Sequence, residues 1–128
     1  MDAPRVLVLD DDPGVRKSLA RFLELYGYRA IAVASLDAAT DAIKDGDIHA
    51  LVLDVRLEGT ATGLDLLRLV RQRSEFDKAP ILVMTGGVLS DAEEAAVTKL
   101  KAHLFYKPEG YDSIVKFLDT LTGRDQEH

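Results

Sequence analysis

Short apolar runs alternate with helical patterns along this chain of 128 residues, and this alternation constrains the fold more than any other feature. Four of the runs are nearly continuous stretches of apolar residues, and a weaker run follows them. The runs cover residues 6–9, 30–33, 50–53, 80–84 and 104–106. Unbroken apolar runs of this length are typical of parallel strands that are covered on both faces. We therefore expect five buried strands in one parallel sheet.

A helical pattern follows each of these runs. Gly27 is placed to end the first helix, and Ser35 and Ser90 are placed to cap the second and the fourth. The apolar positions of the first, third, fourth and fifth helices are, in that order, Val15, Leu19, Phe22, Leu23 and Tyr26; Leu64, Leu67 and Val70; Ala92, Ala95, Ala96 and Leu100; and Ile114, Phe117, Leu118 and Leu121. Five repetitions of strand and helix predict an α/β fold, a doubly wound five-stranded parallel sheet with five helices.

The composition excludes several classes of protein. The chain has no cysteine, so it can form neither a disulfide nor a thiolate metal site. Its formal net charge of −6 disfavours broad binding to the backbone of DNA or RNA. No apolar run approaches the roughly 20 residues of a membrane span, and the N-terminus lacks a signal-peptide layout, so we expect a cytoplasmic protein. The length favours one domain, over residues 1–122, with a polar tail over residues 123–128.

Polar residues follow the apolar runs at the carboxyl ends of the expected strands. Doubly wound folds place their functional crevice at this edge of the sheet. Three adjacent carboxylates after the first strand repel one another unless a cation offsets their charge, and oxygen ligands of this kind favour Mg²⁺. Asp12 precedes Pro13 and is also suited to cap the first helix. The residues at this edge are Asp10, Asp11, Asp12, Asp54, Thr85, Gly86, Gly87 and Lys107.

Asp54 ends an otherwise apolar strand and is the candidate reactive group. A carboxylate can attack phosphorus when a metal and a cation offset the charge, and the product is an acyl phosphate. Thr85 offers a hydroxyl, although a cap of the turn after its strand is an alternative role. Gly86 and Gly87 leave backbone N–H groups that an anion can approach, and Lys107 can grip a phosphoryl oxygen.

Four motifs in order carry a resemblance to a known family: residues 6–13, 51–54, 83–86 and 106–108. On these motifs the chain resembles the receiver domain of two-component response regulators, the CheY-like phosphoacceptor domain, along nearly its whole length. The resemblance implies a flavodoxin-like, CheY-like fold. It also implies that Asp54 accepts a phosphoryl group from a phosphohistidine on a sensor histidine kinase or a histidine phosphotransfer protein.

The same resemblance assigns roles to the other site residues. It implies that Asp11 and Asp54 bind Mg²⁺ directly with the backbone carbonyl of Arg56, while Asp10 acts through water. It implies further that Thr85 and Lys107 contact the phosphoryl group. A cis peptide bond between Lys107 and Pro108 is part of the same pattern, because only an X–Pro bond adopts the cis form cheaply.

Two departures from the family pattern bear on switching. Glu58 stands where a proline is usual, and Gly63 comes one residue late. Leu104 stands where an aromatic residue usually follows the motion of the hydroxyl, so we expect the response to shift to the loop after Thr85 and to the fourth helix. The face formed by the fourth helix, the fifth strand and the fifth helix is then the expected phosphorylation-dependent surface for a downstream protein, an output domain or a homodimer.

Three alternative functions remain open at this point. A flavin- or nucleotide-binding domain can share the fold, but the loop after the first strand carries acids rather than a glycine-rich phosphate loop. An aspartate-based phosphatase needs a second acid two residues after its nucleophile, where this chain has Arg56. A receiver-like domain can also serve protein binding alone. Catalysis by histidine is disfavoured, because His49, His103 and His128 lack the spacing of a metal site or triad.

Overall fold

The computed structural model describes residues 3–55, 62–106 and 111–122, and its centre is one parallel sheet. Its strands are β1 (Arg5–Leu9), β2 (Arg29–Val33), β3 (Ala50–Asp54), β4 (Ile81–Thr85) and β5 (His103–Tyr106). They are arranged in the order β2-β1-β3-β4-β5, and every neighbouring pair is parallel. Each expected apolar run is a strand, so the predicted parallel sheet is confirmed. The expected burial holds for β1, β3 and β4, but it is wrong for the edge strands, because β2 has no buried residue and β5 buries only Phe105.

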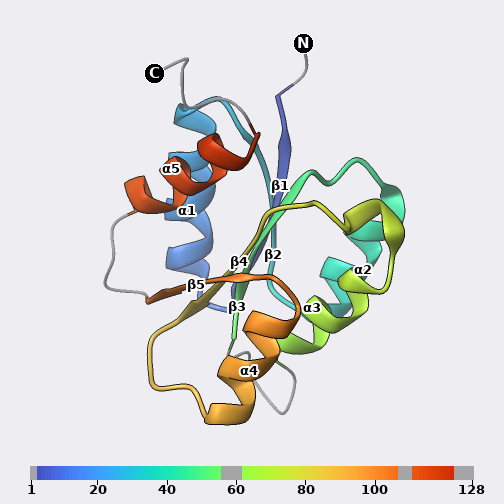
Figure 1. The fold of residues 1–128 in the computed structure, drawn as a ribbon. Helices are drawn as coiled ribbons and strands as arrows, with labels where there is room; N and C mark the ends of the chain where they lie inside the picture. The colour runs from blue at the N-terminus through green and yellow to red at the C-terminus, as the bar shows by residue number, and fades with distance from the viewer. Residues whose placement is uncertain (1–2, 56–61, 107–110, 123–128) are drawn as a thin grey trace.

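Helices cover both faces of the sheet (Figure 1). They are α1 (Pro13–Leu25), α2 (Leu36–Asp45), α3 (Gly63–Arg71), α4 (Asp91–Lys99) and α5 (Tyr111–Thr122), with a short 3₁₀ helix η1 (Ser74–Phe76) before β4. Helices α1 and α5 lie on one side, and α2, α3 and α4 lie on the other. The doubly wound fold with five helices is therefore confirmed. None of the helices in the described ranges is long and apolar enough to cross a membrane.

The core divides into two layers, because alternate side chains of a strand point to opposite faces of the sheet. In β1, Leu7 and Leu9 belong to the layer under α2, α3 and α4, whereas Val6 and Val8 belong to the layer under α1 and α5. All four of these side chains are fully buried. A strand buried on both faces has no polar alternation, which explains why the runs in the sequence are continuous.

The expected helix caps are present. Asp12 caps α1, because its Oδ1 accepts hydrogen bonds from the N–H groups of Gly14 (2.8 Å) and Val15 (3.3 Å). Ser35 caps α2 with one side-chain hydrogen bond. Ser90 caps α4 in a reciprocal pair: its hydroxyl accepts from the N–H of Glu93 (3.1 Å), and its own N–H donates to the Glu93 carboxylate (2.9 Å). Each cap satisfies backbone N–H groups that have no partner inside the helix.

The apolar face of α4 differs from the expectation. Its buried residue is Val97, whereas Ala92 and Ala95, which the helical pattern placed on the apolar face, are exposed. Ala96 and Leu100 are half-buried beside Val97, as expected. The pattern was misleading because methyl side chains carry little hydrophobic free energy, so one valine decides which face of the helix is buried.

Candidate functional site

The topology places the site between β1 and β3. The chain passes from β1 outward to β2 and then returns to β3 on the other side of β1, so the strand order reverses at this point. Ligands of open α/β sheets bind outside the carboxyl ends of the strands at such a reversal. Leu9 and Leu53 are in register across the two strands. Asp10 and Asp54, each one residue further along, therefore lie side by side at this edge.

Three carboxylates converge there. Asp10, Asp11 and Asp54 each offer an oxygen, and these atoms all lie within 4.8 Å of one another. Asp10 is fully buried, Asp54 is 3% exposed, and Asp11 is half-buried. Confining three negative charges in so small a space is unfavourable without a compensating cation. An all-oxygen set with an open side matches Mg²⁺, which keeps several waters and takes few protein ligands. The residues present therefore fit the predicted ion.

Asp10 is held by its backbone as well as its side chain. Its Oδ1 accepts a hydrogen bond from the N–H of Asp12 (2.9 Å), and its N–H donates to the carbonyl of Val33 (3.2 Å). The guanidinium of Arg16 donates to the Asp10 carbonyl at 2.9 Å. Arg16 thus brings a positive charge beside the acidic cluster, a contact that the sequence reasoning missed. The sequence feature that could have indicated this contact is an arginine in the first turns of the helix that follows the three acids.

Gly63 packs directly on the backbone of Asp54. A Cβ atom at Gly63 would lie 2.0 Å from the Asp54 carbonyl oxygen, a distance that no side chain tolerates. The N–H of Gly63 donates to the carbonyl of Val55 at 3.0 Å, which holds the start of α3 against the end of β3. The glycine that comes one residue late in the sequence is therefore required by this close approach, and α3 sets the position of the Asp54 backbone.

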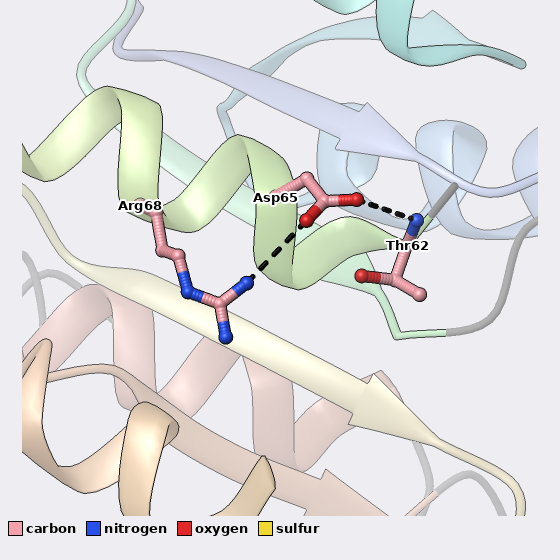
Figure 2. Close-up of polar contacts among 3 residues, drawn as sticks. All are labelled: Thr62, Asp65 and Arg68. Carbon is pink, nitrogen blue, oxygen red and sulfur yellow. Dashed lines mark hydrogen bonds and ion pairs between the residues drawn. The ribbon is translucent and has the colours of Figure 1, made fainter. Parts of the chain in front are cut away.

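The start of α3 is fixed by Asp65 (Figure 2). Its carboxylate accepts a hydrogen bond from the N–H of Thr62 (3.2 Å) and pairs with the guanidinium of Arg68 (3.4 Å). A carboxylate in the first turn of a helix also interacts favourably with the positive end of the helix dipole. Asp65 and Arg68 are both about half exposed, so their ion pair orders the helix terminus and contributes little to global stability.

Thr85 is buried at the carboxyl end of β4, the strand beside β3. Its hydroxyl donates to the Gly87 carbonyl (3.0 Å) and accepts from the Gly87 N–H (3.2 Å). The role as a cap of the turn, which the sequence left as an alternative, is therefore present. This hydroxyl has one proton, so it must give up its hydrogen bond to the Gly87 carbonyl before it can donate to a phosphoryl oxygen. Such an exchange would couple the site to the loop before α4.

Successive side chains of strand β5 point to opposite faces of the sheet. Leu104 is half-buried against the core layer under α2, α3 and α4, and Tyr106, on the same face, is 45% exposed. Phe105 is buried on the opposite face, where its ring packs edge-on against Phe117 of α5 at 5.9 Å between centroids. Tyr106 is in register with Thr85, so it is the aromatic side chain of β5 nearest to the site.

Four predicted positions lie outside the described residues: Arg56, Glu58, Lys107 and Pro108. The backbone carbonyl of Arg56 as a metal ligand and the ammonium of Lys107 as a phosphoryl contact therefore stay predictions. The same holds for the cis peptide bond before Pro108.

Comparison with known proteins agrees with this geometry. A sequence model described as the response regulator receiver domain matches residues 6–119. The chain is 31% identical over 119 residues to the sensory/regulatory protein RpfC of Xanthomonas campestris pv. campestris (strain 8004). This match covers 91% of the chain and 16% of RpfC. It is 44% identical over 82 residues to the response regulator MprA of Mycobacterium avium, covering 63% of this chain and 34% of MprA. The chain therefore spans less than half the length of these relatives.

Solved structures show the same fold. The chemotaxis response regulator CheY4 of Vibrio cholerae superimposes with a TM-score of 0.81 at 23% identity, over 94% of this chain and 99% of that one. A response regulator receiver protein from Pseudomonas putida superimposes with a TM-score of 0.80 at 27% identity, over 94% of this chain and 98% of that one. Because the family match covers most of the chain and the fold agrees, the chain belongs to the response regulator receiver domain family of two-component signalling.

Proposed function

We propose that this domain is a Mg²⁺-dependent phosphoacceptor in which Asp54 receives a phosphoryl group from a phosphohistidine. The observation that carries this proposal is the convergence of Asp10, Asp11 and Asp54 at the point where the strand order reverses. A carboxylate of Asp54 attacks phosphorus, an O–P bond forms, and the N–P bond of the donor breaks. The electron pair of that bond leaves with the imidazole nitrogen. The product is an acyl phosphate on Asp54, and the donor is a sensor histidine kinase or a histidine phosphotransfer protein.

The other residues of the site position charge for this transfer. Bound Mg²⁺ supplies positive charge that offsets the repulsion between the Asp54 carboxylate and the incoming phosphoryl oxygens. Asp11 and Asp54 would hold the ion with the backbone carbonyl of Arg56. Asp10, whose own carbonyl accepts a hydrogen bond from Arg16, would act through water. Lys107 and the Thr85 hydroxyl bind phosphoryl oxygens. The domain is a signalling component that carries one phosphoryl group and does not turn over an external substrate as an enzyme does.

The experiment that tests this proposal is mass spectrometry after incubation with acetyl phosphate and Mg²⁺. The wild type should gain the mass of one phosphoryl group, and Asp54→Asn should gain none. Asp45→Asn is the matched control, because Asp45 is an exposed carboxylate at the end of α2, which lies at the opposite edge of the sheet from the acidic cluster. This control should label as the wild type does. Labelling that persists in Asp54→Asn, or that proceeds equally in EDTA, contradicts the proposal.

We propose that Arg56 sets the lifetime of the acyl phosphate. It lies two residues after Asp54, and alternation along an extended exit would return its side chain to the side of Asp54. There it would restrict the water that attacks the phosphoryl group, so hydrolysis should be faster in Arg56→Ala. The decay of labelled protein measures this rate. An unchanged rate would show that Arg56 acts elsewhere.

The output surface we propose is the face of α4, β5 and α5. When the Thr85 hydroxyl turns to the phosphoryl group, its hydrogen bond to the Gly87 carbonyl is lost and the loop before α4 can move. Helix α4 then moves with this loop, because it buries only Val97. Leu104 contributes weakly, because its rotation exchanges little surface and no hydrogen bond. This face would bind a downstream protein or an output domain, or a second copy of the chain as a homodimer.

Hydrogen exchange with and without beryllofluoride, a phosphoryl mimic, tests this route. Changes in protection should centre on residues 86–101. Changes that centre on residues 104–106 and spare residues 86–101 would instead assign the switch to β5. Light scattering of the same samples measures whether the mimic produces the homodimer.

A further inference from the structure

A basic pocket lies at the edge of the sheet opposite to the site. Helix α3 begins at Gly63, which packs on the Asp54 backbone, and ends at Arg71. Hydrogen bonds from Arg71 join this end of the helix to the segments before β4 and β5. The pocket therefore opens where the parallel strands begin, away from their carboxyl ends. Its volume is about 520 Å³, and its lining is formed by Arg71, Asp77, Lys78, Lys99, Leu100 and Lys101.

The charge of this pocket is opposite to that of the whole chain. Four cationic side chains and one aspartate line it, in a chain whose formal net charge is −6. Lys99 and Lys101 lie at the end of α4, where cations complement the helix dipole, but Lys78 belongs to the segment before β4. Within the described ranges none of the three lysines takes part in an ion pair. The helix dipole alone therefore does not account for the cluster.

Arg71 also lines this pocket, and hydrogen bonds to backbone carbonyls hold its guanidinium in place. Its Nε donates to the Leu100 carbonyl (2.8 Å) and its Nη2 to the Lys101 carbonyl (3.0 Å). Its Nη1 donates to the carbonyls of Phe76 (2.5 Å) and Asp77 (3.5 Å). Burial lowers the pKa of Arg71 from its ordinary value, and the nearby Asp77 carboxylate partly opposes that shift. The hydrogen bonds of this one guanidinium thus connect the C-terminal ends of α3, η1 and α4.

This arrangement selects among anions. Arginine binds phosphate best through two parallel N–H groups of its guanidinium. In Arg71 these groups already donate hydrogen bonds to backbone carbonyls. The lysines remain as single point charges on flexible stems, and the pocket is much larger than one phosphate group. Asp77 further disfavours a compact, doubly charged anion at the centre. Carboxylates that are spaced along a chain fit these lysines better.

We propose that this pocket binds an acidic segment of a partner protein, with Asp or Glu side chains of that segment paired to Lys78, Lys99 and Lys101. The three lysines come from two segments that Arg71 holds together, so the surface is already formed before the partner binds. Preorganisation of this kind reduces the entropy lost on binding. The pocket does not include Asp54, so this binding is separate from the phosphoacceptor role and should persist in Asp54→Asn.

The test measures fluorescence anisotropy of a labelled hexaglutamate peptide at low ionic strength. Replacing Lys78, Lys99 and Lys101 together by Gln should weaken binding about tenfold, because each exposed ion pair contributes modestly. The matched control also removes three positive charges, by replacing Lys17, Arg21 and Lys116, exposed cations of α1 and α5, with Gln. It should change affinity less than about twofold. Added salt should weaken binding of the wild type. Equal losses in both variants, or no binding at all, would overturn the proposal.

Two further readouts locate the peptide and identify its chemistry. In ¹⁵N-correlated NMR spectra of the full chain, the peptide should shift residues 76–79 and 98–102, and shifts centred elsewhere would reject this pocket. Inorganic phosphate at the concentration of the peptide carboxylates should compete poorly. If phosphate displaces the peptide and shifts the same residues, the pocket is a phosphate site and the acidic segment is excluded.

Discussion

Helices α3 and α4 have the same length and cover the same face of the sheet, yet they are anchored very differently. Each has nine residues. Helix α3 buries five of them, among them Leu66 and Leu67, whereas α4 buries Val97 alone. Because burial of apolar side chains is the main source of helix stability in a folded protein, α3 is the firmer of the two.

The difference between these helices matches their positions around the site. Helix α3 starts against the backbone of Asp54, so a firmly packed α3 keeps this proposed phosphoacceptor in place. Helix α4 follows the Thr85–Gly87 turn, whose hydrogen bonds would be the first to change when the Thr85 hydroxyl takes a new partner. Arg71 joins the two helices at their other ends, through the carbonyls of Leu100 and Lys101. We infer that α4 is fixed at its C-terminal end and swings at its N-terminal end.

The largest expected effect comes from truncating the core of α3. Leu67→Ala should lower the free energy of unfolding by about 2–5 kcal/mol, because a fully buried leucine leaves a cavity. Val97→Ala in α4 removes fewer carbon atoms and should lower it by about 1.5 kcal/mol. Urea denaturation of both variants measures the difference. Equal losses would show that α4 is anchored as firmly as its neighbour, and the comparison would fail.

A matched pair of glycine substitutions compares the approaches to the two helices. Gly63→Ala forces a Cβ into the Asp54 carbonyl, so it should destabilise the domain by about 1–3 kcal/mol and slow phosphorylation of Asp54. Gly87→Ala meets no atom within 4 Å, so its effect on stability should stay within about 0.5 kcal/mol. Thermal unfolding and acetyl phosphate labelling of both variants give the two readouts. Normal labelling of Gly63→Ala would show that α3 does not set the position of Asp54.

Removing Arg71 tests the joint between the helices. Arg71→Ala frees four backbone carbonyls, some of which water can reach, and should lower the free energy of unfolding by roughly 1–2 kcal/mol. Arg68→Ala is the control on the same helix, because its exposed ion pair with Asp65 should contribute less than about 0.5 kcal/mol. Amide exchange at residues 98–102 should accelerate only in Arg71→Ala. If exchange there is unchanged, the C-terminal end of α4 is held by other contacts.

Local chemistry explains why much of the fold could be predicted from the sequence. The apolar runs of β1, β3 and β4 correspond to strands that are buried on both faces and therefore leave a continuous signal. The caps Asp12 and Ser90 were recognisable because a cap acts on backbone groups two or three residues away. The acidic cluster followed from topology, since parallel strands that end in acids must end at one edge.

Contacts between distant residues explain what the sequence could not predict. Arg71 bonds to backbone carbonyls 29 and 30 residues away, and a carbonyl has no residue type that a pattern could reveal. The buried hydrogen bond from the Tyr28 hydroxyl to Asp119, at 2.5 Å, joins residues 91 positions apart. Gly63 was visible only as a displaced glycine, because its necessity depends on the 2.0 Å approach to Asp54.

The smallest expected effect is on the cap of α4, and it gives the sharpest test of how this helix is held. Ser90→Ala removes one half of the reciprocal pair with Glu93 and should lower local stability by about 1 kcal/mol. Because α4 buries one residue, this loss should appear as faster amide exchange over residues 91–99 while the rest of the domain keeps its protection. Ser35→Ala, the control, removes the cap of α2, which is anchored by Ala39 and Ile43 and should not open by itself. If protection over residues 91–99 falls only together with that of the whole domain, α4 does not move independently, and a swing of this helix cannot carry the signal.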